Sequence, residues 1–383
     1  MFKSTKYRLY PTKSQAVLLD KHIGACRFIY NLALETKQIA YASNQKNLKC
    51  FDLMNQLPEL KKECDWLRDI NSQSLQQAIV NLDTAYTAFF KGKSEFPKFK
   101  SRRKSSQSFR VPQKVGIFAD AISIPKFNKI KAVIHRTIDG KIKNATILKT
   151  TTGKYFASVL FETAEIAPVK PKITEANTIG VDLGIKDFAI TSEGEKFANP
   201  RFLKKSISKL KFVQRKYSKY KGKRTKQKLA LLHEKVANKR SNFLHQITKK
   251  IVVENQTIAL EDLNVSGMIK NHKLAQAIQD VSWGKFGELI NYKSEWYGSN
   301  IIKIGRFEPS SRMSDCGQVN KELTLKDRVW TCSHCGNTYD RDIQAAKNIK
   351  KFALRNYVSG TDTKTRNELP TLVGVLTCEA RKG

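Results

Sequence analysis

The sequence is poor in acidic residues, with 34 Asp and Glu against 70 Lys and Arg, which gives a formal net charge of +36. In a compact fold these positive charges repel one another unless a polyanion neutralises them. The chain also lacks a lipidation motif and any apolar run near the roughly 20 residues of a membrane span. These absences argue against a membrane protein and favour a nucleic-acid partner over a merely lysine-rich soluble surface.

Cysteine is scarce, with seven residues, and the first residues, MFKSTKYRLYPTKSQ, lack the apolar core of a signal peptide. An odd cysteine count without a secretory signal predicts a reducing, cytoplasmic compartment. Only Cys316, Cys332 and Cys335 are spaced like a metal framework. The 383 residues, 40% of them hydrophobic, predict two or three packed units with real cores.

The first part of the chain predicts a strand, helices and then a β-rich segment. Residues 2–10 form a strand before Pro11, a helix starts at Thr12, and residues 72–90 have the periodicity of an amphipathic helix. Residues 109–163 alternate apolar and polar positions with turn signals between them, which predicts a small barrel or sandwich.

Two segments of this part have side chains suited to nucleic acid. Gln73, Gln76 and Gln77 lie largely off the apolar face of the 72–90 helix, and such amides either read adenine edges or are simply solvated. Residues 96–110, FPKFKSRRKSSQSFR, interleave aromatic and basic side chains. Lys98, Lys100, Arg102 and Arg103 suit phosphate contacts beside stacked bases. A basic connecting loop is the alternative.

Three carboxylates stand where strands end or a helix begins. Asp182 follows the apolar run IGV, Glu261 follows IAL, and Asp342 opens the helical pattern IQAAKNI. Burying a lone carboxylate is expensive, so three that converge would hold divalent ions, Mg²⁺ or Mn²⁺. Singly, Asp182 could form a turn, Glu261 could lie in a surface turn, and Asp342 could cap its helix. Asp340, two residues before Asp342, is the runner-up for the third position.

The order of these motifs resembles the TnpB family, transposon-encoded nucleases related to type V CRISPR effectors. GVDLGIKDFA, ALEDLN, a cysteine segment and YDRDIQAAKNI follow one another as in that family. YPTKSQ…GACRFIYN, the 72–90 helix and FPKFKSRR also match, so the resemblance covers roughly residues 5–355. It implies an RNA-guided DNA endonuclease in which Asp182, Glu261 and Asp342 hold two Mg²⁺ or Mn²⁺ ions. One departure is Gln344, where the family usually has Asn.

The resemblance also implies the domains and partners. The expected fold is a multidomain α/β chain with a β-barrel wedge module (1–10 and 109–172), a helical recognition lobe (11–108), a ribonuclease-H-like, RuvC-like nuclease domain (173–308 and 339–357), a zinc-ribbon-like insert that binds the target nucleic acid (309–338) and a flexible tail (358–383). The expected partners are a guide RNA from the transposon end and duplex DNA with a target-adjacent motif, with one protein per RNA and no membrane. Tyr30 and Arg306 join the expected nucleic-acid contacts.

The cysteine segment departs from the family, which has a CxxC pair where PSSRMSDCGQ offers only Cys316. Met313 stands at the missing ligand in an ungapped alignment, and Ser314 does with a gap of one residue. Asp315 or His334 could complete the tetrahedron.

Whether this segment binds zinc is therefore undecided by the sequence, because a finger without metal could be held by packing around Trp330 and Tyr339. Three rival functions also remain. The chain could be a nuclease-inactive, guide-directed binder, an RNA-independent DNA-binding accessory protein of a transposon, or a lysine-rich structural protein of a ribonucleoprotein.

Overall fold

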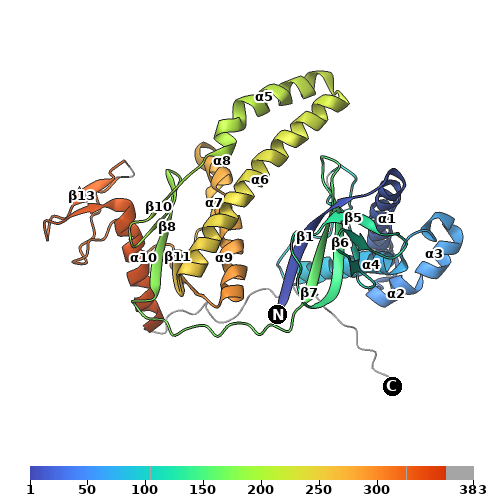
Figure 1. The fold of residues 1–383 in the computed structure, drawn as a ribbon, viewed down its shortest axis with the longest axis horizontal. Coiled ribbons are helices and arrows are strands. Elements are labelled where there is room, and N and C mark those ends of the chain that lie inside the picture. The colour runs from blue at the N-terminus through green and yellow to red at the C-terminus, as the bar shows by residue number, and fades with distance from the viewer. Residues whose placement is uncertain (104, 325, 359–383) are drawn as a thin grey trace. The chain divides into compact units, whose positions relative to one another are not determined.

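The computed structural model describes residues 1–103, 105–324 and 326–358, and these form two compact units (Figure 1). The first unit contains Met1–Ile166, and the second contains the described residues from Ala167 onward. Among the described residues, no helix combines the length and the apolar character needed to cross a membrane. The predicted tail lies outside the described residues except for Val358, where the last helix ends.

The first unit is built on an antiparallel sheet of seven strands in the order β2-β6-β7-β1-β5-β4-β3. Its strands are β1 (Phe2–Tyr10), β2 (Gln107–Val111), β3 (Gly116–Ile117), β4 (Ala121–Ser123), β5 (Ile130–Val133), β6 (Lys141–Lys149) and β7 (Tyr155–Glu162). The first strand lies between β7 and β5, with Lys3 opposite Phe161 and Arg8 opposite Val133. Buried and half-buried residues alternate strictly along β7, as expected of a sheet with one covered face.

Helices pack against this sheet to complete the first core. They are α1 (Lys13–Asn44), α2 (Cys50–Asn55), α3 (Leu57–Glu63), the 3₁₀ helix η1 (Asp65–Leu67) and α4 (Ser72–Phe90). The start of α1 is set by a capping box between Thr12 and Gln15, and that of α4 by the side chain of Asn71. The predicted strand and both predicted helices are therefore confirmed.

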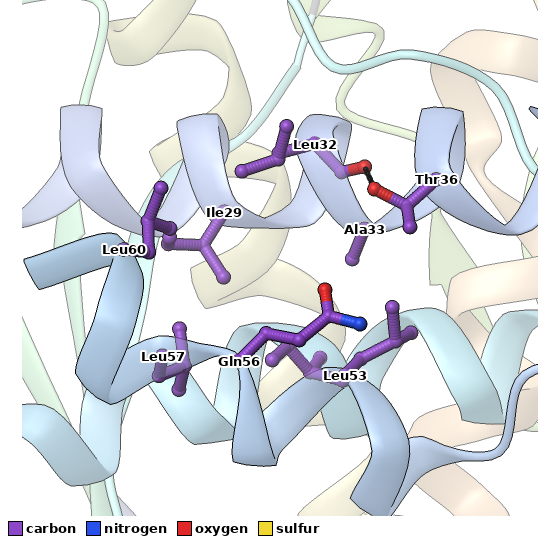
Figure 2. Close-up of a pocket in the computed structure, with 9 residues that line it drawn as sticks. Ile29, Leu32, Ala33, Thr36, Leu53, Gln56, Leu57 and Leu60 are labelled. Carbon is purple, nitrogen blue, oxygen red and sulfur yellow. Dashed lines mark hydrogen bonds between the residues drawn. The ribbon is translucent and has the colours of Figure 1, made fainter. Parts of the chain in front are cut away.

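A small hollow in this unit lies between α1 and the α2–α3 segment (Figure 2). Leucine, isoleucine and alanine side chains line most of it, including Ile29, Ala33 and Leu53. The hydroxyl of Thr36, one of its few polar groups, already donates to the Leu32 carbonyl at 2.8 Å. The hollow thus lacks the cationic or convergent polar groups that a phosphate ligand requires.

The second unit contains a five-stranded sheet and a two-stranded one. The order of the larger sheet is β10-β9-β8-β11-β12, in which β8, β11 and β12 are parallel and β9 and β10 are antiparallel to their neighbours. Its elements are β8 (Thr178–Leu183), β9 (Asp187–Thr191), β10 (Lys196–Ala198), α5 (Phe202–Tyr220), α6 (Lys223–Glu254), β11 (Thr257–Glu261), α7 (Val265–Met268), α8 (His272–Val281), α9 (Trp283–Tyr297), β12 (Asn300–Ile304), β13 (Val329–Thr331), β14 (Thr338–Asp340) and α10 (Arg341–Val358). The strands predicted before Asp182 and Glu261 are β8 and β11, and the helix predicted to open at Asp342 is α10, so these three predictions are confirmed.

The larger sheet is covered on both faces, with α6 and α9 on one side and α10 on the other (Figure 1). Ile179, Val181 and Leu260 belong to the core with α6 and α9. Ala259 and Ile302 belong to the core with α10. Because alternate residues of a strand face opposite sides, this parity decides where the neighbouring carboxylates face.

The helices α5 and α6 form a long hairpin that extends from the second unit (Figure 1). Together they carry sixteen lysines and arginines but only two glutamates. This large excess of positive charge is suited to binding a phosphate backbone.

Candidate active site

Asp182 and Glu261 lie at the carboxyl ends of the adjacent parallel strands β8 and β11. The register pairs Val181 with Leu260, so the two carboxylates follow side by side. Val181 and Leu260 face α6 and α9, and therefore the next residue on each strand faces α10. Asp182 and Glu261 consequently share the face of the sheet that α10 covers.

Gly180 allows α10 to approach this face closely. A Cβ atom at Gly180 would lie 2.0 Å from the carbonyl oxygen of Ala346 and 2.8 Å from the backbone nitrogen of Lys350. Asp182 is two residues beyond Gly180 on the strand, and Asp342 is one helical turn before Ala346. The contact between strand and helix thus brings Asp342 toward Asp182.

The electrostatics of Asp182 agree with this convergence. Burial first, and then the charges of Glu261 and Asp342, raise the pKa of Asp182 from 3.8 to about 7. The Arg341 guanidinium and the backbone N–H of Leu183 act in the opposite direction. A carboxyl group whose pKa is raised by burial and by two neighbouring carboxylates is typical of a divalent-metal site.

The other two carboxylates each have a polar partner. Nη1 of Arg328 donates to both oxygens of Asp342, at 3.0 and 3.1 Å. The Ser310 hydroxyl donates to Oε1 of Glu261 at 2.6 Å. In this arrangement a guanidinium neutralises Asp342, and a hydroxyl fixes the orientation of Glu261.

Asp340, the runner-up for the third position, has a different role in the structure. Its Oδ1 accepts the N–H groups of Asp342 and Ile343, at 3.0 and 3.2 Å, and so caps α10. Its Oδ2 pairs with Lys196 at 2.7 Å. With Asp340 used as the helix cap, Asp342 is the residue of the DRD motif left to face Asp182.

Arg306 binds Asp262, the residue that follows Glu261 in the chain. Its guanidinium binds the Asp262 carboxylate, with Nη2 to Oδ2 at 2.9 Å, and Nε donates to the Asp262 carbonyl at 3.0 Å. Both side chains are exposed at the rim of the sheet. Arg306 therefore supports the segment after β11, and its predicted DNA contact stays a prediction.

The three predicted zinc ligands converge on one point. The Sγ atoms of Cys316, Cys332 and Cys335 lie within 4.8 Å of one another. Among the described residues, no other group of three His, Cys, Asp or Glu side chains has its ligand atoms this close together. The carboxylate oxygens of Asp182, Glu261 and Asp342 are therefore farther from one another than the three sulfur atoms are. The indole of Trp330 and the ring of Tyr339 pack beside them, with centroids 5.1 Å apart. A candidate metal cluster and the aromatic packing thus occur together.

Residues 310–316 join this cysteine cluster to the carboxylates. Nε2 of Gln344 donates to Oδ1 of Asp315 at 2.8 Å and to the Met313 carbonyl at 3.3 Å. Nδ2 of Asn348 donates to the carbonyls of Ser310 and Met313, both at 2.7 Å. Gln344, the departure from the family pattern, therefore fastens this segment to α10.

Two of the predicted nucleic-acid contacts of the first unit, Tyr30 and Lys100, touch each other. Tyr30 is buried, and Nζ of Lys100 lies 3.7 Å above its ring. Gln73 donates to Gln113 at 3.0 Å, while Gln76 is exposed.

The remaining predicted contacts lie on the surface or pair locally. Gln77 donates to Asn81 at 3.2 Å, and Lys98 pairs with Glu95. Arg102 and Arg103 are exposed. The roles of all these residues in nucleic-acid binding stay predictions.

Comparison with known proteins shows relatives along nearly the whole chain. A protein of Streptomyces pristinaespiralis, named as a candidate RNA-guided DNA endonuclease, is 34% identical over 378 residues, which cover 96% of this chain and 93% of the relative. InsQ of Escherichia coli (strain K12), named in the same way, is 30% identical and covers 90% of each chain. A TnpB-like protein of Acanthamoeba polyphaga mimivirus is 22% identical over 92% of this chain.

This chain belongs to the TnpB family. Residues 158–272 match the OrfB_IS605 family, described as "Probable transposase". Residues 283–349 match "Cas12f1-like, TNB domain", and residues 1–46 match "Helix-turn-helix domain". The first match contains Asp182 and Glu261 of this TnpB-family chain, and the second contains Asp342 and the cysteines.

The fold of this TnpB-family chain resembles that of a chain in a cryo-EM structure of a Cas12f1–sgRNA–target DNA complex. The TM-score is 0.57 at 13% identity, and the match covers 88% of this chain and 83% of that one. Together with the cysteine cluster, this likeness indicates an α/β fold of the Cas12 type.

Sequence reasoning missed several residues that hold the site of this TnpB-family chain. Arg328, Ser310 and Asn348 make their contacts with residues 14 to 49 positions away. The only local signal was Gly180 inside an apolar strand, because glycine at such a position often marks a close approach of another backbone.

Proposed function

We propose that this chain is an RNA-guided DNA endonuclease that cleaves DNA at a divalent-metal centre formed by Asp182, Glu261 and Asp342. The observation that carries the proposal is that Asp182 and Glu261 share the sheet face to which the close contact at Gly180 brings Asp342, with both neighbours raising the pKa of Asp182. The names of the relatives from S. pristinaespiralis and E. coli support the RNA-guided activity.

The topology supports a ribonuclease-H-like, RuvC-like nuclease domain in the second unit. β8 is flanked by the antiparallel strands β9 and β10 on one side and by the parallel strands β11 and β12 on the other. Such sheets place functional groups at the carboxyl ends of their parallel strands, where Asp182 and Glu261 lie.

The donor set suits Mg²⁺ or Mn²⁺, because these hard cations prefer carboxylate oxygens. Asp182, Glu261 and Asp342 would hold the ions, which when bound supply an activated water and stabilise the leaving oxygen in phosphodiester hydrolysis. The Ser310 hydroxyl orients Glu261 for this role. Arg328 balances the charge of Asp342, and Arg341 lowers the proton affinity of Asp182.

The charge of the chain supports the proposed partners. A guide RNA from the transposon end and a duplex target bring many phosphates, and a net charge of +36 matches them. In RNA-guided recognition the protein grips the heteroduplex by its backbone and reads only a short motif beside the target. We propose that one protein binds one RNA in the cytoplasm. The basic α5–α6 hairpin and the 96–110 segment are suited to backbone contacts.

The first experiment is to express the chain with its native flanking DNA and to sequence the RNA that co-purifies. One structured RNA with a variable end is the expected result. Random nucleic acid, or none, would overturn the guided part of the proposal and favour an RNA-independent DNA-binding accessory protein.

The second experiment tests the site on the same ribonucleoprotein. Asp182→Ala and Glu261→Ala should abolish cleavage while target binding persists. Glu288→Gln is the matched control, because it removes an exposed acid on α9 that pairs only locally with Lys285. Cleavage by Asp182→Ala at the wild-type rate would refute the site, and wild-type protein that binds its target without cutting would indicate a nuclease-inactive binder.

A further inference from the structure

The cysteine cluster has the dimensions of a metal site rather than of a disulfide. The Sγ atoms of Cys316 and Cys332 are 3.8 Å apart. A disulfide requires about 2.05 Å. Around a tetrahedral zinc ion with Zn–S distances of about 2.3 Å, neighbouring sulfur atoms are about 3.8 Å apart. The three thiols therefore fit three corners of a zinc tetrahedron.

The hydroxyl of Ser314 lies beside this cluster. Its side chain is completely buried, and its Oγ is 3.0 Å from the Sγ of Cys316 and 3.1 Å from the Gln318 carbonyl oxygen. A serine hydroxyl has one proton, and a carbonyl can only accept. When Ser314 donates to Gln318, its oxygen remains available as an acceptor, and the thiol of Cys316 becomes the donor in the shorter contact.

The other candidates for the fourth ligand make other contacts or are exposed to solvent. Met313 is buried in the core that α10 forms with the sheet. The carboxylate of Asp315 accepts from Gln344 at 2.8 Å. His334 is exposed. The hydroxyl of Tyr339 lies 3.6 Å from the Sγ of Cys335 and accepts the N–H of Asp315 at 3.3 Å.

We propose that this chain binds zinc with three thiolates and one oxygen, the Oγ of Ser314. The neutral hydroxyl replaces the fourth thiolate expected from the family, so the bound site carries one negative charge less than a four-cysteine site. A neutral oxygen attracts Zn²⁺ more weakly than a thiolate does. The ion is consequently held less tightly and exchanges faster than in a four-thiolate finger.

The test is a metal titration of the reduced, metal-free full chain with Co²⁺ as a spectroscopic probe, followed by displacement with Zn²⁺. The wild type should bind one ion with the absorption of a tetrahedral three-sulfur, one-oxygen site. Ser314→Cys should add a fourth sulfur-to-cobalt transition and raise the Zn²⁺ affinity about tenfold or more. Ser314→Ala should lower the affinity about tenfold. Ser333→Ala, an exposed serine between Cys332 and Cys335, is the control and should match the wild type.

Two results would overturn the proposal. If Ser314→Ala matches the wild type in both spectrum and affinity, the fourth ligand is not Ser314, and a parallel loss in Tyr339→Phe would assign it to the phenol. If the wild type binds no ion while Ser314→Cys does, the oxygen cannot complete the site. The readout requires no nucleic acid, so its failure leaves the proposed nuclease activity untouched, and a failure of cleavage leaves the metal site untouched.

Discussion

Replacing Asp182 by asparagine should abolish cleavage and yet stabilise the metal-free protein. In the folded chain, burial and the neighbouring carboxylates raise the pKa of Asp182 from 3.8 to about 7. Each pKa unit corresponds to about 1.4 kcal/mol, so the ionised side chain costs at most on the order of 4 kcal/mol above pH 7. Because Asp182 is only half-buried, we expect roughly half of that, about 2 kcal/mol.

The gain in stability should depend on pH. Between about pH 4 and pH 7 the folded state keeps a proton on Asp182 that the unfolded state has lost, so wild-type stability from this group falls as pH rises. Asparagine does not titrate. The stability advantage of Asp182→Asn should therefore grow across this window, level off above about pH 7 and vanish near pH 4.

Thermal unfolding of the full chain in EDTA, followed by tryptophan fluorescence, measures this effect. Three of the four tryptophans, Trp283, Trp296 and Trp330, lie in the second unit and report on it. For a unit of this size, 1 kcal/mol shifts Tm by about 2–4 °C, so we expect a rise of about 4–8 °C at pH 8. Added Mg²⁺ should stabilise the wild type and narrow the difference.

Asp280→Asn is the matched control with the opposite sign. Its carboxylate accepts the N–H groups of Leu203 and Lys204 at the start of α5, so loss of its charge should destabilise the protein by about 0.5–2 kcal/mol. If Asp182→Asn is less stable than the wild type at pH 8 in EDTA, the ionised Asp182 side chain does not destabilise the metal-free protein, and the reasoning fails.

Three further predictions concern the architecture of the site. Gly180→Ala should lower stability by about 1–3 kcal/mol and reduce cleavage, because its Cβ would overlap the backbone of α10. Gly284→Ala in α9, with open space around it, should leave cleavage unchanged and should not lower stability in unfolding assays. Ser310→Ala should raise the Mg²⁺ concentration for half-maximal cleavage about fivefold, since Glu261 loses a hydrogen bond of about 1 kcal/mol; an unchanged Mg²⁺ titration would contradict this. Target affinity should fall at least about a thousandfold between 50 and 200 mM salt if six or more phosphates are contacted, and a flat salt dependence in filter binding would contradict a phosphate interface.

The sequence alone predicted the two strands and the helix that carry the three carboxylates of the second unit. Apolar runs with Asp182 and Glu261 at their ends fall on β8 and β11, and the helix opened by Asp342 is α10. Hydrophobic periodicity and end signals are local, so they can be recognised in a single chain. The order of the motifs also pointed to the family that the relatives confirm.

Contacts between distant segments were beyond the sequence. Nothing in the periodicity indicated that Arg328 would pair with Asp342 or that Ser310 would bind Glu261, because these depend on how loops fold back over the sheet. The choice between Asp340 and Asp342 likewise required the helix cap, which two neighbouring aspartates could each supply from sequence alone.

The cysteine segment shows the same division. The sequence by itself determined that this segment lacks a fourth cysteine, and it left Met313, Ser314, Asp315 and His334 as candidates for the missing ligand. The tertiary structure buries Met313 against α10 and leaves the Ser314 hydroxyl beside the thiols. The two residues are adjacent in the chain, so the choice between them depends on how the segment packs, and Gln344 and Asn348 both bind the Met313 carbonyl there.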